Sequence, residues 1–506
     1  MNIKKFLLGL GDWIKKNPLE FSFLLAILLV GAFLRLYRID EYMTFLGDEG
    51  RDVIIVRRIF TELHPPLIGP GTSVGGMYLG PLYYYMMALP LLLSGFSPVG
   101  PAVMVALLGV ATIFFIWFVG KKWFGNFAGL IAGGLYAVSP VPIIFSHSSW
   151  NPNIMPFFSL LCVYAIWKVW KENKLNWLVV MGISFAFVLQ SHYLGLLLAP
   201  TLFLFWIITL IKEKSKKVFI QKSILGLISF LLLMSPLLIF DLRHDFMNAK
   251  AFNNFLVNRD STVSINLFES IKKVPETFNL ITRSLIGAKN TFVSLVLSIF
   301  LSFATFWFLL TKRFKDKSSL YLIIAWILFA TLGLSFYKLS IYDHYLGFVF
   351  VVPYILIGIL LSKFSERGRV FKGISILIVL LLVILNLMQN PFRHEPNRLL
   401  KRSQDVAGKI LSLDNDKPFN LAVIADNNYE DGYEYYLYLW GGRVLNADIN
   451  DASTITDQLF VICEREETKC DPTHSPKAEV ANFGMSEIEN KWSVDGVIIY
   501  KLIHTK

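Results

Sequence analysis

The sequence Phe45-Leu46-Gly47-Asp48-Glu49-Gly50-Arg51-Asp52 places four charged residues shortly after the first long apolar run, residues 19–37. A run of that length can cross a bilayer as a helix. The lysines before it predict a cytoplasmic start, so the charged stretch emerges on the opposite side. Adjacent carboxylates beside an arginine suit a site that moves a proton and orients an anionic group. The alternative is a solvated loop whose charges only end the helix.

The composition is that of a polytopic membrane protein. Of the 506 residues, 55% are hydrophobic and only 17% are charged, which is too apolar for a soluble enzyme of this length. The formal charge of +11 comes largely from short Lys/Arg clusters between apolar runs, the pattern of cytoplasmic loops and not of a nucleic-acid surface. Three cysteines exclude a disulfide scaffold, although Cys463 and Cys470 can pair if they face an oxidising compartment.

Hydropathy and the basic loops together predict about eleven transmembrane helices. The short apolar stretch 81–96 is interpreted as an interfacial or re-entrant helix, because counting it as a span would place the lysine-rich loops outside. One topology then keeps every basic loop in the cytoplasm. The predicted spans are 19–37, 100–120, 126–145, 154–170, 176–190, 194–211, 223–240, 290–311, 319–336, 345–361 and 373–388.

The chain is predicted to contain an all-α membrane domain, residues 1–389, and a small extracytoplasmic α/β domain, residues 390–506. The second part has about 115 residues and is large enough to fold by itself. The expected elements outside the spans are the first external loop 38–99 with an amphipathic helix near 50–63, an external segment 241–289 with helical patterning at 246–257 and 265–286, strands at 419–425, 459–463 and 497–502, and a helix at 398–411.

The same topology brings several polar, aromatic-rich connections to the face that carries Asp48. Ionisable groups gathered at one end of a membrane bundle indicate a functional site. The alternative is that each group caps a helix or anchors at the lipid headgroups. Besides Arg51 and Asp52, the candidate substrate-binding residues are His147, Trp150, Asn151, Gln190, His192, Tyr193, Arg243, His244, Lys338, Asp343 and His344.

An external site in a membrane bundle suits a substrate whose polar head sits at the surface while its tail lies in the bilayer. A phosphate-linked sugar donor would need cations for the leaving phosphate, a carboxylate base and aromatic or amide groups for the sugar. Asp48 or Glu49 is the expected base. The cations expected at the phosphate are Arg243, His244 and Lys338. The expected sugar pocket consists of Trp150, Asn151, His192 and Tyr193.

No cofactor is indicated with certainty. A divalent metal at Asp48 and Glu49, joined by His147 and His192, is a weaker hypothesis, because these residues lack the helical spacing typical of metal ligands.

Several motifs resemble the family 39-type glycosyltransferases of the GT-C membrane fold. They are Gly47-Asp48-Glu49-Gly50-Arg51-Asp52, Ile68-Gly69-Pro70, Gly80-Pro81-Leu82-Tyr83-Tyr84-Tyr85, Ser139-Pro140, Trp150-Asn151-Pro152 and Gln190-Ser191-His192-Tyr193. The resemblance covers roughly residues 20–360, and the group is similar in plan to protein O-mannosyltransferases and to the bacterial lipid A aminoarabinose transferase. It implies a polyprenyl- or dolichyl-phosphate-sugar donor, inversion at the anomeric carbon and an acidic motif that falls here on Asp48 and Glu49.

Two departures from this family pattern leave questions open. In several GT-C branches a second external loop adds another acid, whereas this chain has Trp150-Asn151 there, so metal use and the choice of base stay open. The C-terminal domain does not match the carbohydrate-binding domains of eukaryotic O-mannosyltransferases, so the acceptor is a lipid, a glycan or a protein. The resulting hypothesis is a multi-pass cell-membrane glycosyltransferase with a cytoplasmic N-terminus. The alternatives are a flippase or transporter of lipid-linked glycans and a glycan polymerase or ligase.

Overall fold

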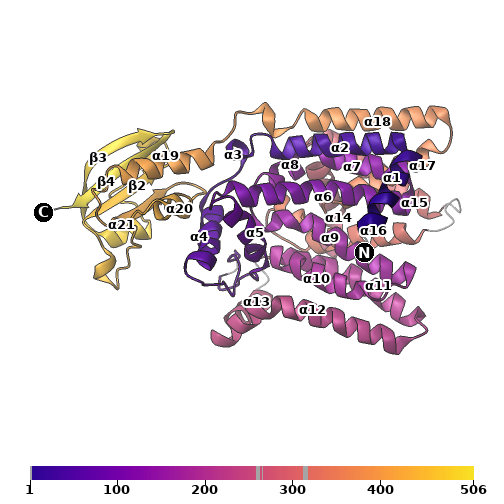
Figure 1. Cartoon of the computed structure of the whole chain (residues 1–506), viewed down its shortest axis with the longest axis horizontal. Helices are drawn as coiled ribbons and strands as arrows, with labels where there is room; N and C mark the ends of the chain where they lie inside the picture. The colour runs from indigo at the N-terminus through magenta and orange to yellow at the C-terminus, as the bar shows by residue number, and fades with distance from the viewer. Residues whose placement is uncertain (1–2, 74, 258–261, 265, 311–316, 506) are drawn as a thin grey trace.

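The computed structural model describes residues 3–73, 75–257, 262–264, 266–310 and 317–505. A helical bundle forms one end of the molecule and a small domain with a four-stranded sheet forms the other, with short helices between them (Figure 1). The C-terminus lies at the far end of the sheet domain (Figure 1). The predicted fold class, a helical membrane bundle followed by a small α/β domain, is confirmed.

Within the described residues, eight helices are long and apolar enough to cross a membrane, and a bent helix pair makes a ninth. Two shorter apolar helices, α10 (Trp177–Ser191) and α17 (Val352–Ser365), pack beside α9 and α7. The described residues thus contain eight or nine helices of spanning length, fewer than the predicted eleven unless α10 and α17 also cross. The eight are α2 (Pro18–Leu36), α6 (Val99–Phe124), η1 with α9 (Asn151–Ile154 and Met155–Glu172), η2 with α11 (Tyr193–Leu198 and Ala199–Lys212), α12 (Lys216–Arg243), α15 (Thr291–Leu310), α16 (Ser318–Ser335) and α18 (Arg369–Leu387).

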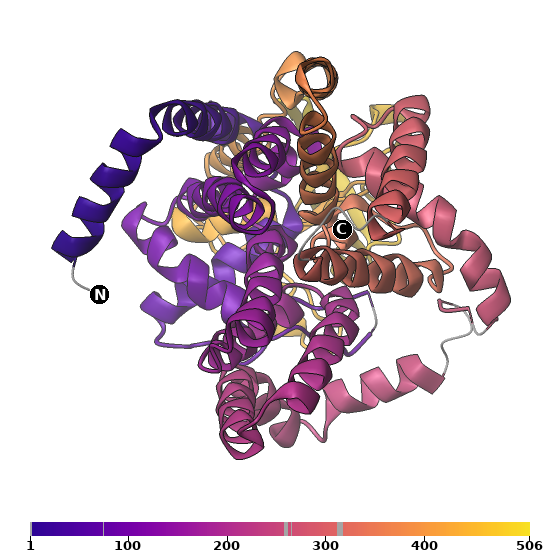
Figure 2. The ribbon, with the colours of Figure 1, turned by 90° about the vertical axis from the view of Figure 1, so that its right-hand side faces the viewer.

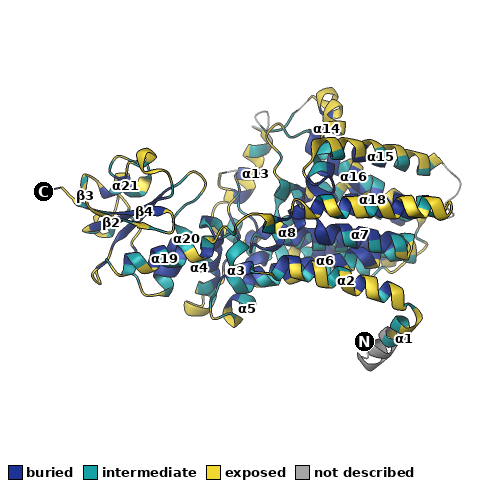
Figure 3. Ribbon diagram, turned by 90° about the horizontal axis from the view of Figure 1, so that it is seen from above, coloured by how far each residue is buried: buried dark blue, intermediate teal, exposed yellow. Residues whose placement is uncertain are grey.

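The outer surface of the bundle is apolar. Outer helices such as α15 and α18 are exposed along much of their length (Figure 3), and the exposed side chains include Leu232, Phe303 and Leu377. A continuous exposed apolar surface of this kind marks contact with a membrane. The chain is therefore a multi-pass membrane protein.

The bent pair consists of α7 (Asn126–Val138) and α8 (Pro140–Ser146), which differ in direction by 61°. Pro140 has no N–H to donate to the carbonyl of Tyr136, so the helix breaks there. The buried guanidinium of Arg35 replaces the missing donors, with Nη2 3.2 Å from the carbonyl oxygen of Tyr136 and Nη1 2.9 Å from that of Ala137. The break directs the chain that follows α8 toward the external loops.

The first external loop contains α3 (Ile39–Tyr42), α4 (Gly47–Thr61) and α5 (Leu82–Leu93). The predicted amphipathic helix is α4, and it packs between α5 and helix α20 of the C-terminal domain. With 12 residues, α5 is about 18 Å long and too short to cross a bilayer. This length agrees with the interpretation of residues 81–96 as a segment that does not span.

The remaining helices of the membrane part lie at the edge of the bundle. Viewed along the long axis, α1 (Ile3–Lys16) projects from its rim (Figure 2). The predicted external helices correspond to α13 (Met247–Val257) and α14 (Leu267–Leu285). The predicted range 265–286 includes residue 265, and the span 290–311 includes residue 311, both outside the described residues.

The C-terminal domain has a mixed sheet in the order β1-β2-β4-β3, with β1 parallel to β2 and the other pairs antiparallel. Cys463, the last residue of β2, forms a disulfide with Cys470. Its elements are α19 (Leu399–Leu411), β1 (Asn420–Ile424), α20 (Asp431–Leu439), β2 (Gln458–Cys463), α21 (Ala478–Phe483), β3 (Ser486–Val494) and β4 (Val497–His504), with short 3-10 turns η5 (Pro391–Arg393), η6 (Ala452–Thr454) and η7 (Glu467–Lys469).

The C-terminal domain shares a hydrophobic core with the first external loop. Phe45 and Val53 lie in one buried cluster with Tyr433, Tyr435 and Leu437 of α20. The ring centroids of Phe45 and Tyr435 are 6.2 Å apart, edge to face. Burying several large apolar side chains on both sides stabilises this contact. The acidic end of α4 is therefore held between the bundle and the C-terminal domain.

Candidate active site

The first two turns of α4 carry the predicted acidic cluster. Arg51 joins two carboxylates, because Nη1 donates to Oδ1 of Asp48 at 2.8 Å and Nη2 donates to Oδ1 of Asp52 at 2.7 Å. The hydroxyl of Tyr84 donates to the same Asp52 oxygen at 3.0 Å. Glu49 caps the helix by accepting from the backbone N–H of Leu46 at 3.1 Å. A helix N-terminus favours negative charge, so this is a suitable place for several acids.

The three carboxylates differ in exposure. Asp52 is fully buried and Glu49 is 6% exposed, whereas the side chain of Asp48 is 43% exposed. Burial raises the pKa of Glu49 to about 7. Burial also raises the pKa of Asp52 to about 6, although the charge of Arg51 opposes this change. Asp48 is thus the carboxylate of this cluster that an incoming substrate can reach.

The C-terminal domain contributes a side chain that the sequence did not indicate. The hydroxyl of Tyr429 donates to Oδ1 of Asp48 and lies 3.4 Å from Nη1 of Arg51. Beside it, Oδ1 of Asn428 accepts from the backbone N–H of Gly47 at 2.9 Å. The exposed carboxylate is therefore oriented from both sides, by Arg51 on its own helix and by Tyr429 on the other domain.

The glycines that flank Asp48 allow this close approach. A Cβ atom on Gly47 would lie 2.4 Å from the ring of Tyr429, and one on Gly50 would lie 2.3 Å from the backbone nitrogen of Gly432. No real Cβ atom tolerates such distances without movement of its neighbours. The two glycines are thus required for the C-terminal domain to pack against α4.

A cluster of rings forms a second part of the site. The ring of Trp150 lies 4.6 Å from that of His344, and His192 lies 6.0 Å from His344 and 5.0 Å from Tyr345. Burial lowers the pKa of His192 and of His344 to about 4, and the charges of Asp343 and, less strongly, Asp48 oppose this change at His344. Both imidazoles are therefore neutral at pH 7 and offer hydrogen bonds, not positive charge. The electrostatic effect of Asp48 on His344 connects this cluster to α4.

The three cations predicted to bind phosphate lie on two different external segments, and all three are exposed. Arg243 and His244 lie at the exposed end of α12, and Nδ1 of His244 is 2.8 Å from the carbonyl oxygen of Phe240. Across the described residues, no hydrogen bond or ion pair joins either side chain to α4. Lys338 is exposed in the connection after α16. A phosphate-binding role for these three residues stays a prediction.

Lys289 is a cation beside the ring cluster that the sequence analysis did not select. Its Nζ lies 3.3 Å from Oδ2 of Asp343, the residue before His344. Asp343 was predicted as a site residue, and the structure gives it this partner. Lys289 lies just before α15, in a loop without a recognisable motif.

Asn151, Gln190 and Tyr193 use their polar atoms to hold the external loops. The amide of Asn151 donates to a backbone carbonyl at the end of α10 at 2.7 Å. Gln190 accepts from the first backbone N–H of α5 at 3.3 Å and donates to a carbonyl of α12 at 3.0 Å. The hydroxyl of Tyr193 donates to the backbone carbonyl of Tyr78. These contacts position the loops around the site.

The residues around Asp48 give limited support for the metal hypothesis. Asp48 and Glu49 are consecutive helical residues, so their side chains point about 100° apart. In the described part of the chain, no group of three or more His, Cys, Asp or Glu side chains is arranged to hold a metal ion. A metal at this site stays a prediction.

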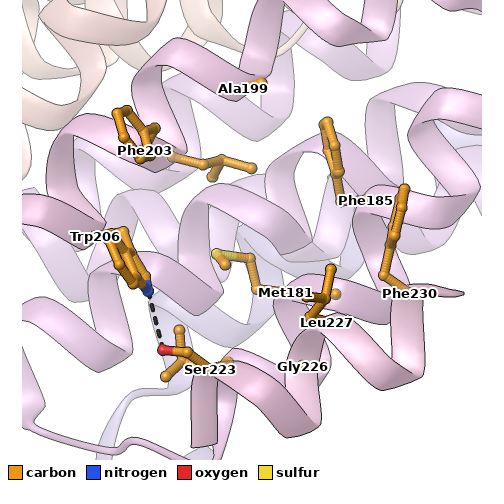
Figure 4. A pocket seen from close by; sticks show the side chains of 12 residues that line it. Met181, Phe185, Ala199, Phe203, Trp206, Ser223, Gly226, Leu227 and Phe230 are labelled. Carbon is orange, nitrogen blue, oxygen red and sulfur yellow. Dashed lines mark hydrogen bonds between the residues drawn. The ribbon is translucent and has the colours of Figure 1, made fainter. Parts of the chain in front are cut away.

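A separate apolar pocket of about 290 Å³ lies among α10, α11 and α12 (Figure 4). Met181, Phe185, Phe203 and Phe230 line it, and Nε1 of Trp206 donates to Oγ of Ser223 at 3.0 Å. Its lining carries no acid, base or cation.

Comparison with known proteins connects this fold to glycosyltransferases. Residues 79–240 match the family described as dolichyl-phosphate-mannose-protein mannosyltransferase. YkcB of Bacillus subtilis (strain 168), named as a mannosyltransferase, is 25% identical over 237 residues, which are 44% of this chain and 31% of YkcB. The chain thus spans about a third of the length of this curated relative.

Two solved structures resemble the whole chain. ArnT from Cupriavidus metallidurans bound to undecaprenyl phosphate has a TM-score of 0.61 at 13% identity, covering 95% of this chain and 97% of ArnT. The archaeal oligosaccharyltransferase AglB from Archaeoglobus fulgidus, in complex with an inhibitory peptide and a dolichol-phosphate, has a TM-score of 0.51 at 11% identity, covering 89% and 70%. The resemblance of this chain to membrane glycosyltransferases of the GT-C fold and protein mannosyltransferase type is therefore confirmed.

Proposed function

We propose that this protein is an inverting membrane glycosyltransferase that takes its sugar from a polyprenyl- or dolichyl-phosphate-linked donor. The observation that carries the proposal is the state of Asp48, an exposed carboxylate at the end of a buried acidic cluster, oriented by Arg51 and by Tyr429. Lipid phosphates bound to ArnT and AglB support the donor class. In this proposal the acceptor is a hydroxyl-bearing lipid, glycan or protein.

In the proposed reaction, Asp48 takes the proton from the acceptor hydroxyl, and the oxygen of that hydroxyl attacks the anomeric carbon of the donor sugar. The bond between that carbon and the phosphate oxygen breaks, and its electron pair leaves with the lipid phosphate. Attack from the face opposite the phosphate inverts the anomeric carbon. Arg51 and Tyr429 hold the carboxylate in place, so less orientational freedom has to be lost before the reaction.

The ring cluster and the nearby cations are proposed to bind the donor. Trp150 and His192 offer an aromatic face and a neutral hydrogen-bonding edge to the sugar. Lys289 pairs with Asp343, the neighbour of His344, at the edge of the ring cluster. Lys338, Arg243 and His244 reach the phosphate only if the exposed external segments close over the donor.

We propose that the site and the C-terminal domain face the extracytoplasmic side and that the N-terminus is cytoplasmic. The lysines before α2 favour a cytoplasmic start. The disulfide between Cys463 and Cys470 supports an oxidising surrounding for the C-terminal domain.

The proposal is tested by transfer assays in sealed membranes of known orientation. Radiolabelled polyprenyl-phosphate sugars are supplied to the extracytoplasmic or the cytoplasmic face, and nucleotide sugars serve as controls. Transfer of label to a second molecule from the extracytoplasmic face supports the proposal. Movement of an intact lipid-linked sugar across the bilayer without transfer would indicate a flippase instead. An EDTA arm tests the metal: loss of transfer that Mg²⁺ or Mn²⁺ restores would add a metal to the mechanism.

A further inference from the structure

A cavity of about 340 Å³ lies at the external ends of the spans, between the bundle and the linker that leads to the C-terminal domain. Its volume is within the range of about 300–1,000 Å³ that is typical of small-molecule sites. Tyr42 and Thr44 of the first external loop, His147 after α8, Lys289 and Glu395 of the linker are among the residues that line it. We call it the linker cavity.

His147 is the unusual member of this lining. Its side chain is only 1% exposed, and its ring packs near Tyr42 and Phe392, with centroids 6.3 and 5.7 Å away. One ring nitrogen interacts with the backbone carbonyl of Ile143, whereas Nε2 is buried and has no hydrogen-bond partner. A buried polar atom without a partner costs about 1–3 kcal/mol, which a bound ligand can recover.

The chemistry of Nε2 follows from the other ring nitrogen. A nitrogen that interacts with a carbonyl oxygen must donate, so it carries the proton. Burial lowers the pKa of His147 to about 4, so the ring is neutral at pH 7 and Nε2 is a hydrogen-bond acceptor. The missing partner is therefore an O–H or N–H donor.

The rest of the lining narrows the class of ligand. Lys289 supplies an ammonium donor, Glu395 a carboxylate acceptor and Tyr42 an aromatic face. A fully ionised phosphate has no donor for Nε2 of His147 and would be repelled by Glu395. A hydrocarbon chain would leave all of these groups unpaired. A carbohydrate, whose hydroxyls both donate and accept, satisfies each of them.

The linker cavity is connected to the site at α4. Thr44 lines the cavity and precedes Asp48 by four residues, a length of chain that spans at most about 14 Å. The backbone N–H of Thr44 donates to Oγ of Ser148 at 3.0 Å, so the cavity wall is fixed to the loop after α8. Lys289 links the same cavity to Asp343 and the ring cluster. The cavity wall at Thr44 and the exposed carboxylate are thus close along the chain.

We propose that the linker cavity binds a sugar residue of the acceptor, and that a shift of the His147 ring turns its buried Nε2 toward the cavity to accept a hydrogen bond from a sugar hydroxyl. This inference rests on the proposed function and makes it more specific, because it identifies the acceptor as a glycan or glycolipid. A lipid whose buried part is only hydrocarbon would leave the nitrogen without its donor, whereas a protein would have to supply a hydroxyl or amide in place of the sugar.

The test follows the histidine directly in the full-length protein. The measurement is an NMR spectrum of protein labelled in its imidazole rings, and the chain has only eight histidines to distinguish. The protein is held in lipid nanodiscs, because many detergents have sugar headgroups. Comparison of wild type with His147→Phe assigns the signal of His147, and His147→Gln serves the same purpose if the first variant does not fold. Methyl α-mannoside, methyl β-glucoside, methyl β-N-acetylglucosaminide and inorganic phosphate are then titrated separately. His474, which is exposed in the C-terminal domain, is the internal control.

The expected result is a saturable shift of the His147 signal with at least one glycoside, without the same shift for His474 and without the same shift in phosphate. No response to any glycoside, or a response to phosphate alone, would overturn the inference. The readout needs no turnover, so it stays interpretable if the protein proves not to transfer sugar. Conversely, if wild type transfers sugar but the His147 signal does not change with any glycoside, the proposed function stands and the linker cavity is not the acceptor site.

Discussion

Tyr429→Phe removes one hydroxyl and leaves the ring that packs against Gly47. The hydroxyl is the contact that the C-terminal domain makes with the carboxylate of Asp48. A hydrogen bond to a charged group contributes about 1.5–3 kcal/mol. Because Asp48 is partly exposed and Arg51 still donates to it, water and Arg51 replace part of this interaction. The lower limit, about 1.5 kcal/mol, corresponds to roughly a tenfold loss of kcat.

The assay is transfer from the active donor in native membranes at matched protein levels. Tyr436→Phe is the matched control, because this tyrosine lies on α20 but its hydroxyl accepts from Gln404 and not from α4. We expect Tyr436→Phe to keep near wild-type kcat and Tyr429→Phe to lose about tenfold, with little change in KM for the donor. Equal rates in Tyr429→Phe and wild type would refute the idea that the C-terminal domain orients Asp48.

Three further changes test the surroundings of the site. Glu49→Gln keeps a side-chain acceptor that caps α4. In the wild type, burial raises the pKa of Glu49 to about 7, so the folded protein binds more protons than the unfolded chain between pH 4.5 and 7. Wild-type stability therefore falls as pH rises through this window, and the variant should gain on the order of 3 kcal/mol at pH 8 but little at pH 4, measured by thermal unfolding. Gly50→Ala places a Cβ against Gly432, so we expect faster proteolysis of the linker and slower transfer; unchanged proteolysis would contradict the close packing. Gln190→Leu leaves the first backbone N–H of α5 without its acceptor and removes the amide's hydrogen bond to α12, so it should cost about 1–3 kcal/mol, visible as a lower Tm.

The bundle was predictable because apolar runs and basic loops constrain each other. One topology kept every lysine cluster on one side, and it excluded residues 81–96 as a span, in agreement with the short α5. Three strands of the C-terminal domain were also predictable from apolar β-rich runs. The fourth, β3 (Ser486–Val494), was missed because it is an edge strand with mostly exposed polar residues and lacks a clear apolar face.

The acidic part of the candidate site was predictable because Asp48 and its neighbours form a local motif. Tyr429 and Lys289 were not, because each reaches the site through tertiary packing from a distant part of the chain. A signal for the first was present. Polar and aromatic residues, Asn428 and Tyr429, follow β1, a fully buried strand, and strand ends often carry functional side chains. Gln190 shows the opposite error, since a polar residue near the site serves the packing of three helices.

The central claim is that Asp48 is the base for sugar transfer from a lipid phosphate. The most direct measurement compares single-turnover transfer by wild type and Asp48→Asn, with donor binding followed by photo-crosslinking in the same samples. A general base contributes about 10²–10⁴-fold, so the account predicts a loss of at least about a hundredfold in rate with donor crosslinking unchanged. Transfer by Asp48→Asn at the wild-type rate would contradict it.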